Sequence, residues 1–513
     1  MHNPDHFETL TIDGCSLTLR DFIEVARYNK KVRVAPTAIE LMARSRRVVE
    51  DIVKSGKPAY GINTGFGDFS RVSVSREDAS TLQNNLILSH CTGMGDPYPQ
   101  EVVRGMMLLR ANALCSGYSG IRPEIVCTLI DMLNQGVHPN VPQKGSLGAS
   151  GDLAPLSHLA LVLLGKGEAL FDDQLLTGDQ AMLKAGLPTY TLLAKEGLAL
   201  INGTQAMCSC GALVLHDALH AAKLADIVAS MSIEALRGLT SAFEERVQAV
   251  RPQKGQKLVA KNLLKLCEDS KILDMSCRLR VQDAYTLRCI PQVHGAVRVA
   301  LSHVQDIVQD ELNAVTDNPL IFAEDGAVIS GGNFHGEPLA MAFDYLGIAA
   351  AELASISERR IERMVNPQLS GLPAFLVKNG GLNSGMMIVQ YAAASMVSEN
   401  KIYAHPASVD SIPSSANQED HVSMGTTAAR KARLIIENTL SVLALELMCA
   451  CQGLDLIDEE ASPIHRTIHS YVREFVDYYD IDREIRLDIN QMNKIIRSDE
   501  LLRMTKKILP DFE

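Results

Sequence analysis

The chain has 513 residues, of which 46% are hydrophobic, so it is long enough to bury a large core. Its net charge is −12, from 49 basic and 61 acidic residues. There is no dense Lys/Arg run, which argues against nucleic acid as a partner. The eleven cysteines are dispersed in apolar surroundings, a pattern typical of buried free thiols in a reducing compartment.

The amino-terminal residues 1–8 carry acidic side chains and lack the basic start and apolar run of a signal peptide. The longest apolar stretches fall short of the roughly 18–20 residues that cross a bilayer. One of them, residues 440–451, also contains Glu446. We therefore expect a cytoplasmic protein with no membrane span and no membrane partner.

Strand signals are short and lie mostly in the first 200 residues and around residues 327–330. A glycine-rich stretch at residues 60–67 (YGINTGFG) predicts a loop able to close over a ligand. A phosphate loop would need a following Gly-Lys-Ser/Thr, which is missing. We expect residues 1–225 to form a smaller, mixed amino-terminal region.

Residues 145–155 (GSLGASGDLAP) can build an electrophile from the backbone itself. If a tight turn brings the Gly151 nitrogen onto the Ala149 carbonyl, ring closure and the loss of two waters leave a methylidene-imidazolone (MIO) ring. One of these waters comes from the Ser150 side chain. Only a residue without Cβ lets its nitrogen approach a carbonyl so closely, and Gly151 meets that need.

The ordinary structure of an isolated Ala-Ser-Gly tripeptide is a plain surface turn. A serine-hydrolase elbow is excluded, because it needs glycine two residues after the serine, where this chain has Asp152. The choice between a turn and a cyclised ring therefore depends on the other sequence blocks.

The second half of the chain is dominated by helical patterns. In residues 426–453 one proline-free apolar stripe is formed by positions 436, 440, 443, 447 and 450. Residues 339–364 and 386–404 show the same pattern, and the first of them ends before Pro367. We expect a mainly α protein in which residues 226–513 form a bundle of long helices.

Other patterns imitate known sites and are discounted. His216 and His220 have helical spacing but lack the Glu that follows the first His in a zinc-protease helix. The Cys-x-Cys pairs at positions 208/210 and 449/451 lack the two-residue gap of a zinc site. The sequence around Ser398 matches Ser-x-x-Lys without the accompanying Lys-Thr-Gly. We predict no metal site.

The segment at residues 145–155 resembles the signature of the aromatic amino acid ammonia-lyases, and the resemblance extends over residues 10–480. The matching blocks occur at residues 60–67, 202–205 (NGTQ), 282–288 (QDAYTLR), 330–335 (SGGNFH) and 417–421 (NQEDH). The resemblance implies a long-helix bundle of the fumarase/aspartase type, although the Ser-Ser-x-Met-Pro loop of those enzymes is absent. It also implies a homotetramer with composite active sites. The MIO ring would form autocatalytically from Ala149, Ser150 and Gly151, with no external cofactor.

The resemblance assigns roles to residues in these blocks. Tyr60 matches the family's candidate base, a role that needs a pKa lowered by positive or hydrogen-bonding neighbours; a core-edge tyrosine is the alternative. Arg288 matches the group that binds the substrate carboxylate; the alternative is an arginine that forms an interface salt bridge. Tyr285 and Asn202 match residues that hold the ring oxygen and the reacting amine. The other implied substrate-site residues are Gln282, Phe334 and Gln418.

Two positions bear on the substrate. His90 argues against phenylalanine as the substrate, because relatives that use phenylalanine have a Phe residue at this position. Glu419 stands where relatives that use phenylalanine or tyrosine have glutamine, and a carboxylate can accept an imidazole N–H. The resemblance therefore implies L-histidine as substrate and trans-urocanate as product, although Glu419 could instead form an ion pair beside Asp420 and His421. Ala407 departs from the pattern, since many histidine-using relatives have histidine there.

Three alternatives stay open from the sequence. They are a family member that uses tyrosine, an aminomutase that returns the amine to the β-carbon, and a non-catalytic helical oligomer that has lost the ring. A β-amino acid product would identify the second, and an unmodified Ser150 in a retained oligomer would support the third.

Overall fold

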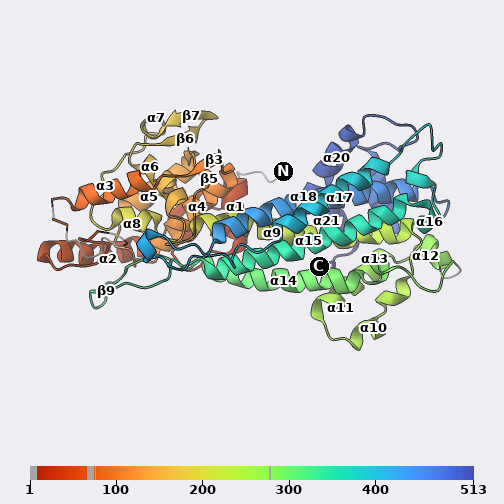
Figure 1. The fold of residues 1–513 in the computed structure, drawn as a ribbon, viewed down its shortest axis with the longest axis horizontal. Coiled ribbons are helices and arrows are strands. Elements are labelled where there is room, and N and C mark those ends of the chain that lie inside the picture. Colours follow the sequence, from red (N-terminus) through yellow and green to blue (C-terminus); the bar gives the residue numbers. More distant parts are fainter. Residues whose placement is uncertain (1–7, 66, 68–73, 76, 277–278) are drawn as a thin grey trace. The chain divides into compact units, whose positions relative to one another are not determined.

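The computed structural model describes residues 8–65, 67, 74–75, 77–276 and 279–513 (Figure 1). Residues 1–7, on which the absence of a signal peptide was argued, lie outside the described residues, as does Phe66 of the glycine-rich stretch. The chain is mainly helical with short strands, which confirms the predicted fold class.

The chain divides into two compact units. Unit 1 comprises residues 1–213, 305–344 and 406–430, and unit 2 comprises residues 214–304, 345–405 and 431–513. Each unit is therefore assembled from three chain segments. The first break between the units falls within helix α9 (Gln205–Ala235), the same helix that contains the boundary expected near residue 225.

Unit 1 contains all the strands that the structure describes, together with the shorter amino-terminal helices. The helices are α1 (Leu19–Tyr28), α2 (Pro36–Ser55), α3 (Ala79–His90), α4 (Gln100–Cys115), α5 (Pro123–Gln135), α6 (Leu153–Leu163), α7 (Gly178–Lys184), α8 (Glu196–Ile201) and the 3-10 turn η5 (Ser415–Asn417). The strands are β1 (Leu10–Ile12), β2 (Val32–Val34), β3 (Met94–Pro97), β4 (His138–Pro139), β5 (Pro142–Lys144), β6 (Glu168–Phe171), β7 (Gln174–Thr177), β8 (Leu320–Phe322) and β9 (Ala327–Ile329). They pair as parallel β1–β2 and antiparallel β3–β5, β4–β6–β7 and β8–β9.

The predicted long helices are confirmed. They correspond to α15 (Glu337–Val365), α17 (Met387–Tyr403) and α18 (Gly425–Leu454). The predicted apolar stripe on α18 is at most 4% exposed at each of its five positions, 436, 440, 443, 447 and 450, because it faces neighbouring helices. Helices α9, α14 (Ile290–Glu311), α15 and α18 have residues in both units.

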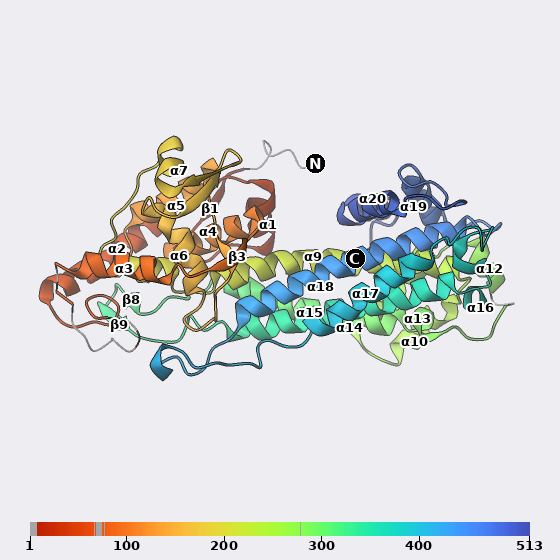
Figure 2. The same cartoon turned by 45° about the horizontal axis from the view of Figure 1, so that its top comes forward.

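Unit 2 is a helical bundle. The parts of the long helices that belong to it lie side by side with α17 (Figures 1 and 2). Shorter elements complete it: η3 (Thr240–Phe243), α10 (Glu245–Ala249), α11 (Lys254–Leu266), α12 (Lys271–Ser276), α13 (Tyr285–Arg288), α16 (Pro367–Ser370), η4 (Ala374–Leu376), α19 (Pro463–Arg473), α20 (Ile485–Arg497) and α21 (Glu500–Ile508).

The expectation that no apolar stretch is long enough to cross a bilayer is wrong for two helices. Helices α15 and α18 are both long and apolar enough, by length and composition, to cross a bilayer. Their most apolar windows are 67% and 78% buried inside the structure, respectively. A core helix of a folded protein meets the same criterion, and this burial accounts for their apolar composition.

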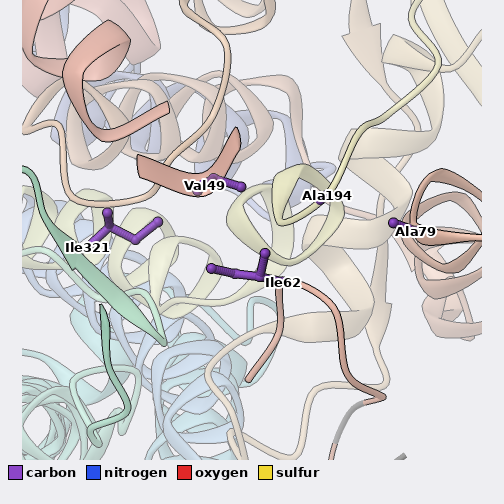
Figure 3. Close-up of a cluster of buried hydrophobic side chains, with 5 residues drawn as sticks. All are labelled: Val49, Ile62, Ala79, Ala194 and Ile321. Atoms are coloured by element: carbon purple, nitrogen blue, oxygen red, sulfur yellow. The ribbon is translucent and has the colours of Figure 1, made fainter. Parts of the chain in front are cut away.

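A cluster of apolar side chains in unit 1 holds the start of the glycine-rich stretch in place. Val49, Ile62, Ala79, Ala194 and Ile321 are each at most 5% exposed and come from separate segments of unit 1 (Figure 3). Ile62 itself is fully buried. Burying these side chains removes their apolar surface from water and so stabilises the backbone around position 62.

Glu446, the acid inside the apolar stretch of α18, is paired within unit 2. Its carboxylate accepts two hydrogen bonds from Arg360, at 2.5 and 2.8 Å. The hydroxyls of Ser232 and Ser357 donate to it at 2.6 and 2.5 Å. Both charged side chains are fully buried, so this group links α9, α15 and α18.

We predict that Glu446→Gln lowers the free energy of unfolding by about 3–5 kcal/mol, because it leaves the Arg360 charge buried and unpaired. The control is Glu500→Gln, which breaks the more exposed pair with Arg503 and should cost about 1 kcal/mol or less. Chemical unfolding followed by circular dichroism measures both. Equal losses in the two variants would contradict this account.

Candidate active site

The segment that carries Ala149, Ser150 and Gly151 lies between β5 and α6 in unit 1. Its backbone is a tight turn in which Gly148 and Gly151 pair with each other and have φ values of +73° and +74°. A Cβ at Gly151 would lie 2.2 Å from the carbonyl oxygen of Gly203. Only glycine fits at position 151, as the cyclisation chemistry requires.

Asp152 anchors this turn. Its amide nitrogen donates to the Gly203 carbonyl at 2.7 Å. Its buried carboxylate accepts from the Ser146 hydroxyl at 2.7 Å, from the Met207 amide at 2.8 Å and from the Thr426 hydroxyl. Burial raises the pKa of Asp152, and these hydrogen bonds oppose the rise. One carboxyl group therefore ties the turn to the starts of α9 and α18.

Glu419 is held against the turn by two serines. The Ser150 hydroxyl donates to one carboxylate oxygen of Glu419 and the Ser414 hydroxyl donates to the other, both at 2.9 Å. Ser414 and Glu419 also exchange backbone hydrogen bonds at 2.9 and 3.3 Å. These bonds close the turn η5, whose three residues have φ values between +52° and +64°. Within the described residues, the partners found for Glu419 are these hydroxyls and no cation.

A cavity of about 230 Å³ opens beside the turn. It is lined by Ser89, His90, Thr92, Gly145, Ser146, Leu147, Ala149, Gly151, Leu153, Ala154, Ser414 and Glu419. Among the described residues of this lining, the only ionisable side chains are those of His90 and Glu419. Burial lowers the pKa of His90, while the nearby Glu419 carboxylate opposes that shift. The described part of the lining therefore offers an acceptor for a substrate N–H but no lysine or arginine for a carboxylate.

Tyr60 lines a neighbouring cavity of about 350 Å³, together with Lys57 and Pro319 among others. Burial raises the pKa of Tyr60, the charge of Glu419 raises it further, and only a backbone hydrogen bond at Gly67 lowers it. This direction is opposite to the one expected for a base. Within the described residues of unit 1, Tyr60 lacks the lowered pKa that the role would need.

Asn202 lies at the end of α8 and is 3% exposed. Its side-chain nitrogen donates to the Asn318 carbonyl at 3.1 Å, while its side-chain oxygen has no hydrogen-bond partner among the described residues. A buried oxygen without a donor is rare in folded proteins, so this atom is available to a ligand N–H.

Phe334 is partly buried in the loop before α15, and Gln418 is exposed beside η5.

The structure does not place Gln282, Tyr285 and Arg288 in the same unit as the turn. They belong to unit 2, at or next to α13. The guanidinium carbon of Arg288 lies 4.5 Å from the ring centre of Tyr285, and its Nε donates to the Asp283 carbonyl at 3.0 Å. Tyr285 is 70% exposed. Its phenol ring is therefore accessible on the surface of this unit.

Some residues that shape the site carried no assignment from the sequence. Asp152 directly follows the tripeptide, and an acid at the start of an apolar helix could have marked it. Ser414 and Gly203 give no such signal, because each acts through contacts with residues far away in the sequence. The same holds for Arg110, which donates to the Asn202 carbonyl from α4.

Comparison with known proteins agrees with this geometry. The family model for aromatic amino acid lyases matches residues 17–474. The chain belongs to the aromatic amino acid lyase family. It is 56% identical to the histidine ammonia-lyase of Caldanaerobacter subterraneus subsp. tengcongensis, over 97% of this chain and 98% of that protein.

Solved structures of family members have the same fold. The histidine ammonia-lyase from Trypanosoma cruzi matches with a TM-score of 0.91 and 43% identity, over 98% of this chain and 95% of that one. The tyrosine aminomutase from Streptomyces globisporus matches with a TM-score of 0.93 and 37% identity, over 98% and 99% of the two chains. The family resemblance seen in the sequence is confirmed.

We predict that Gly151→Ala destabilises unit 1 by more than about 3 kcal/mol, because the added methyl group meets the Gly203 backbone. The matched control is Gly186→Ala. Gly186 has φ +67° and no atom within 4 Å of an added Cβ, so it should cost only about 1–2 kcal/mol for the left-handed backbone. Thermal unfolding compares the two variants, and equal shifts would contradict the importance of the contact with Gly203.

Proposed function

We propose that this protein is a cytoplasmic histidine ammonia-lyase, which eliminates ammonia from L-histidine to give trans-urocanate as the first step of histidine degradation. The observation that carries this proposal is the placement of Glu419 against Ser150 at the edge of the cavity. Curated relatives that are 50–56% identical over nearly the whole chain bear the same name.

The turn at residues 149–151 fits an MIO ring. In the proposed closure, the Gly151 nitrogen bonds to the Ala149 carbonyl carbon. The carbonyl oxygen leaves as water with the amide protons of Gly151 and Ser150, and a C=N bond remains. The Ser150 hydroxyl then leaves with the Ser150 α-proton as a second water, and an exocyclic C=C bond remains. The finished ring would supply a carbon electrophile that makes the substrate amine a better leaving group.

The loss of the Ser150 hydroxyl has a consequence for Glu419. One carboxylate oxygen of Glu419 loses its hydrogen-bond donor, while Ser414 still holds the other oxygen. An imidazole N–H of the substrate can restore the missing hydrogen bond to this half-buried carboxylate. A phenyl or phenol ring offers no N–H to this oxygen. This difference favours histidine over phenylalanine and tyrosine.

Other groups of unit 1 complete the substrate pocket in this proposal. The free side-chain oxygen of Asn202 accepts an N–H from the substrate amine. His90 stays uncharged over more of the pH range because burial lowers its pKa. Phe334 and Gln418 keep the family's substrate-site roles as part of the proposal.

The substrate carboxylate and the base require a second copy of the chain. Among the described residues, the cavity lining contains no arginine or lysine, and a carboxylate is best bound by a bidentate guanidinium. We assign this role to Arg288 of another copy, with Tyr285 and Gln282 beside it, in a homotetramer with composite sites. A cation delivered in this way would also lower the pKa of Tyr60, as its role as the base for the β-proton demands.

An aminomutase is the second candidate, and the likeness to a solved tyrosine aminomutase favours it. Such an enzyme would return the amine to the β-carbon, so its product is a β-amino acid. Identification of the product by chromatography separates the two activities.

We predict that Glu419→Gln lowers kcat/KM for L-histidine by roughly 100-fold, which corresponds to about 2.7 kcal/mol, and narrows the preference over L-tyrosine. Glu324→Gln, which neutralises an exposed acid of unit 1, is the control and should leave both values unchanged. Steady-state absorbance assays on both amino acids measure the ratio. An unaltered histidine-to-tyrosine ratio in Glu419→Gln would rule out the assigned role.

We predict that the wild-type peptide containing residues 149–151 is two waters lighter than its sequence. Ser150→Ala, which cannot form the exocyclic double bond, should keep the fold and lose turnover. Mass spectrometry of a proteolytic digest and circular dichroism check both statements. An unmodified Ser150 in a folded oligomer would instead support the non-catalytic alternative.

A further inference from the structure

Arg110 is a fully buried cation beneath the turn. It lies in α4, and its Nη1 donates to the Asn202 carbonyl at 2.7 Å and to the Gln205 side-chain oxygen at 2.9 Å. Its Nε and Nη2 have no hydrogen-bond partner among the described residues. The nearby carboxylate of Asp317 pairs instead with the buried Lys195, at 2.8 Å. Arg110 is therefore a buried charge that binds a backbone carbonyl and an amide oxygen, without a direct ion pair to any described residue.

Such a charge is costly. Burial lowers the pKa of Arg110 to about 10, so the guanidinium stays protonated at neutral pH while it has lost its hydration. An apolar side chain of similar volume would avoid this cost. The presence of an arginine at position 110 is therefore better explained by the groups that it binds than by a contribution to the stability of α4.

A second buried arginine of the same helix provides a comparison. Arg104 donates to the Val25 carbonyl at 3.1 and 2.8 Å and to the Leu133 carbonyl at 3.0 Å, and it contacts His138. Burial lowers its pKa to about 10 as well. Arg104 thus links α4 to other elements of unit 1, and its hydrogen bonds to described residues involve neither residues 145–155 nor 202–205.

The peptide that Arg110 holds leads directly into Gly203. A Cβ at Gly203 would lie 2.5 Å from Nη1 of Arg110. On its other side, the Gly203 carbonyl accepts from the Asp152 amide at 2.7 Å, and a Cβ at Gly151 would lie 2.2 Å from that carbonyl oxygen. Gly203 is therefore packed between Arg110 and the turn at Gly151. Movement of Arg110 would release Gly203 and, with it, Gly151.

We propose that Arg110 is a positioning residue for ring closure: by holding the Asn202 carbonyl it fixes Gly203, and Gly203 keeps Gly151 in the tight turn from which its nitrogen bonds to the Ala149 carbonyl carbon. This inference rests on the proposed MIO ring. Arg110 contributes no atom to the reaction, in which two waters leave and no oxidant is needed. Its effect appears in the extent of dehydration at residues 149–151.

The test compares Arg110→Met and Arg110→Lys with Arg104→Met and Arg104→Lys. Each protein is purified at fixed times after a short pulse of synthesis, and its folded fraction is isolated by size exclusion. Mass spectrometry then gives the share of the 149–151 peptide that has lost two waters. Turnover is not the readout, because loss of Arg110 also disturbs the backbone of Asn202.

We expect the dehydrated share to form roughly tenfold more slowly or to stay incomplete in both Arg110 variants, with lysine less severe than methionine. Both Arg104 variants should be dehydrated as fast as the wild type, even where their thermal unfolding midpoints fall. Dehydration at the wild-type rate in Arg110→Met would overturn the proposal. So would failure of both Arg110 variants to fold while the Arg104 variants fold, because Arg110 would then be a purely structural residue.

The wild-type control separates this inference from the proposed function. If the wild-type peptide keeps both waters, the proposed MIO ring and the proposed role of Arg110 are both wrong. If the wild-type peptide is dehydrated and the Arg110 variants are dehydrated equally, only the proposed role of Arg110 is wrong.

Discussion

The contact between the backbones of Gly151 and Gly203 is the constraint on which the candidate site depends. There is no room for a side chain between these two residues. Because both are glycine, the turn lies closer to the start of α9 than residues with side chains would allow. The Asp152 amide and carboxylate then secure the turn to Gly203, α9 and α18. The helices α9 and α18 begin beside residues 149–151, and the hydrogen bonds of Asp152 to both hold this turn in place.

Charge is distributed unevenly around this turn. The cavity beside it is lined by the acid Glu419 and by His90, whose pKa is lowered by burial. Of the nearby buried cations, Arg110 donates to the Asn202 carbonyl and Lys195 pairs with Asp317. A zwitterionic amino acid needs both an acceptor and a cation. Among the described residues the cavity lining offers the acceptor without the cation, which is the physical reason for proposing a composite site, and burial together with the charge of Glu419 raises the pKa of Tyr60.

The sequence predicted the fold class and the family resemblance because both depend on local patterns. The apolar stripe of α18 and the Ala-Ser-Gly run can be recognised without knowing any distant contact. Arg110, Gly203 and Ser414 could not be found in this way, since each acts on residues separated from it by the fold. The apolar lengths of α15 and α18 exceed the uninterrupted apolar runs of the sequence, because polar residues such as Glu446 interrupt the runs without ending the helix. The pKa of Tyr60 depends on burial and on Glu419, which no spacing reveals.

The most direct test of the proposed activity is to incubate the purified protein, without added cofactor, with L-histidine, L-tyrosine and L-phenylalanine separately. The ultraviolet absorbance of the conjugated acid and the released ammonia are recorded together. The account predicts urocanate and an equal amount of ammonia from histidine, with little or no product from the other two amino acids. Product from tyrosine or phenylalanine alone would contradict the role assigned to Glu419, and no product from any of the three would contradict the proposed activity.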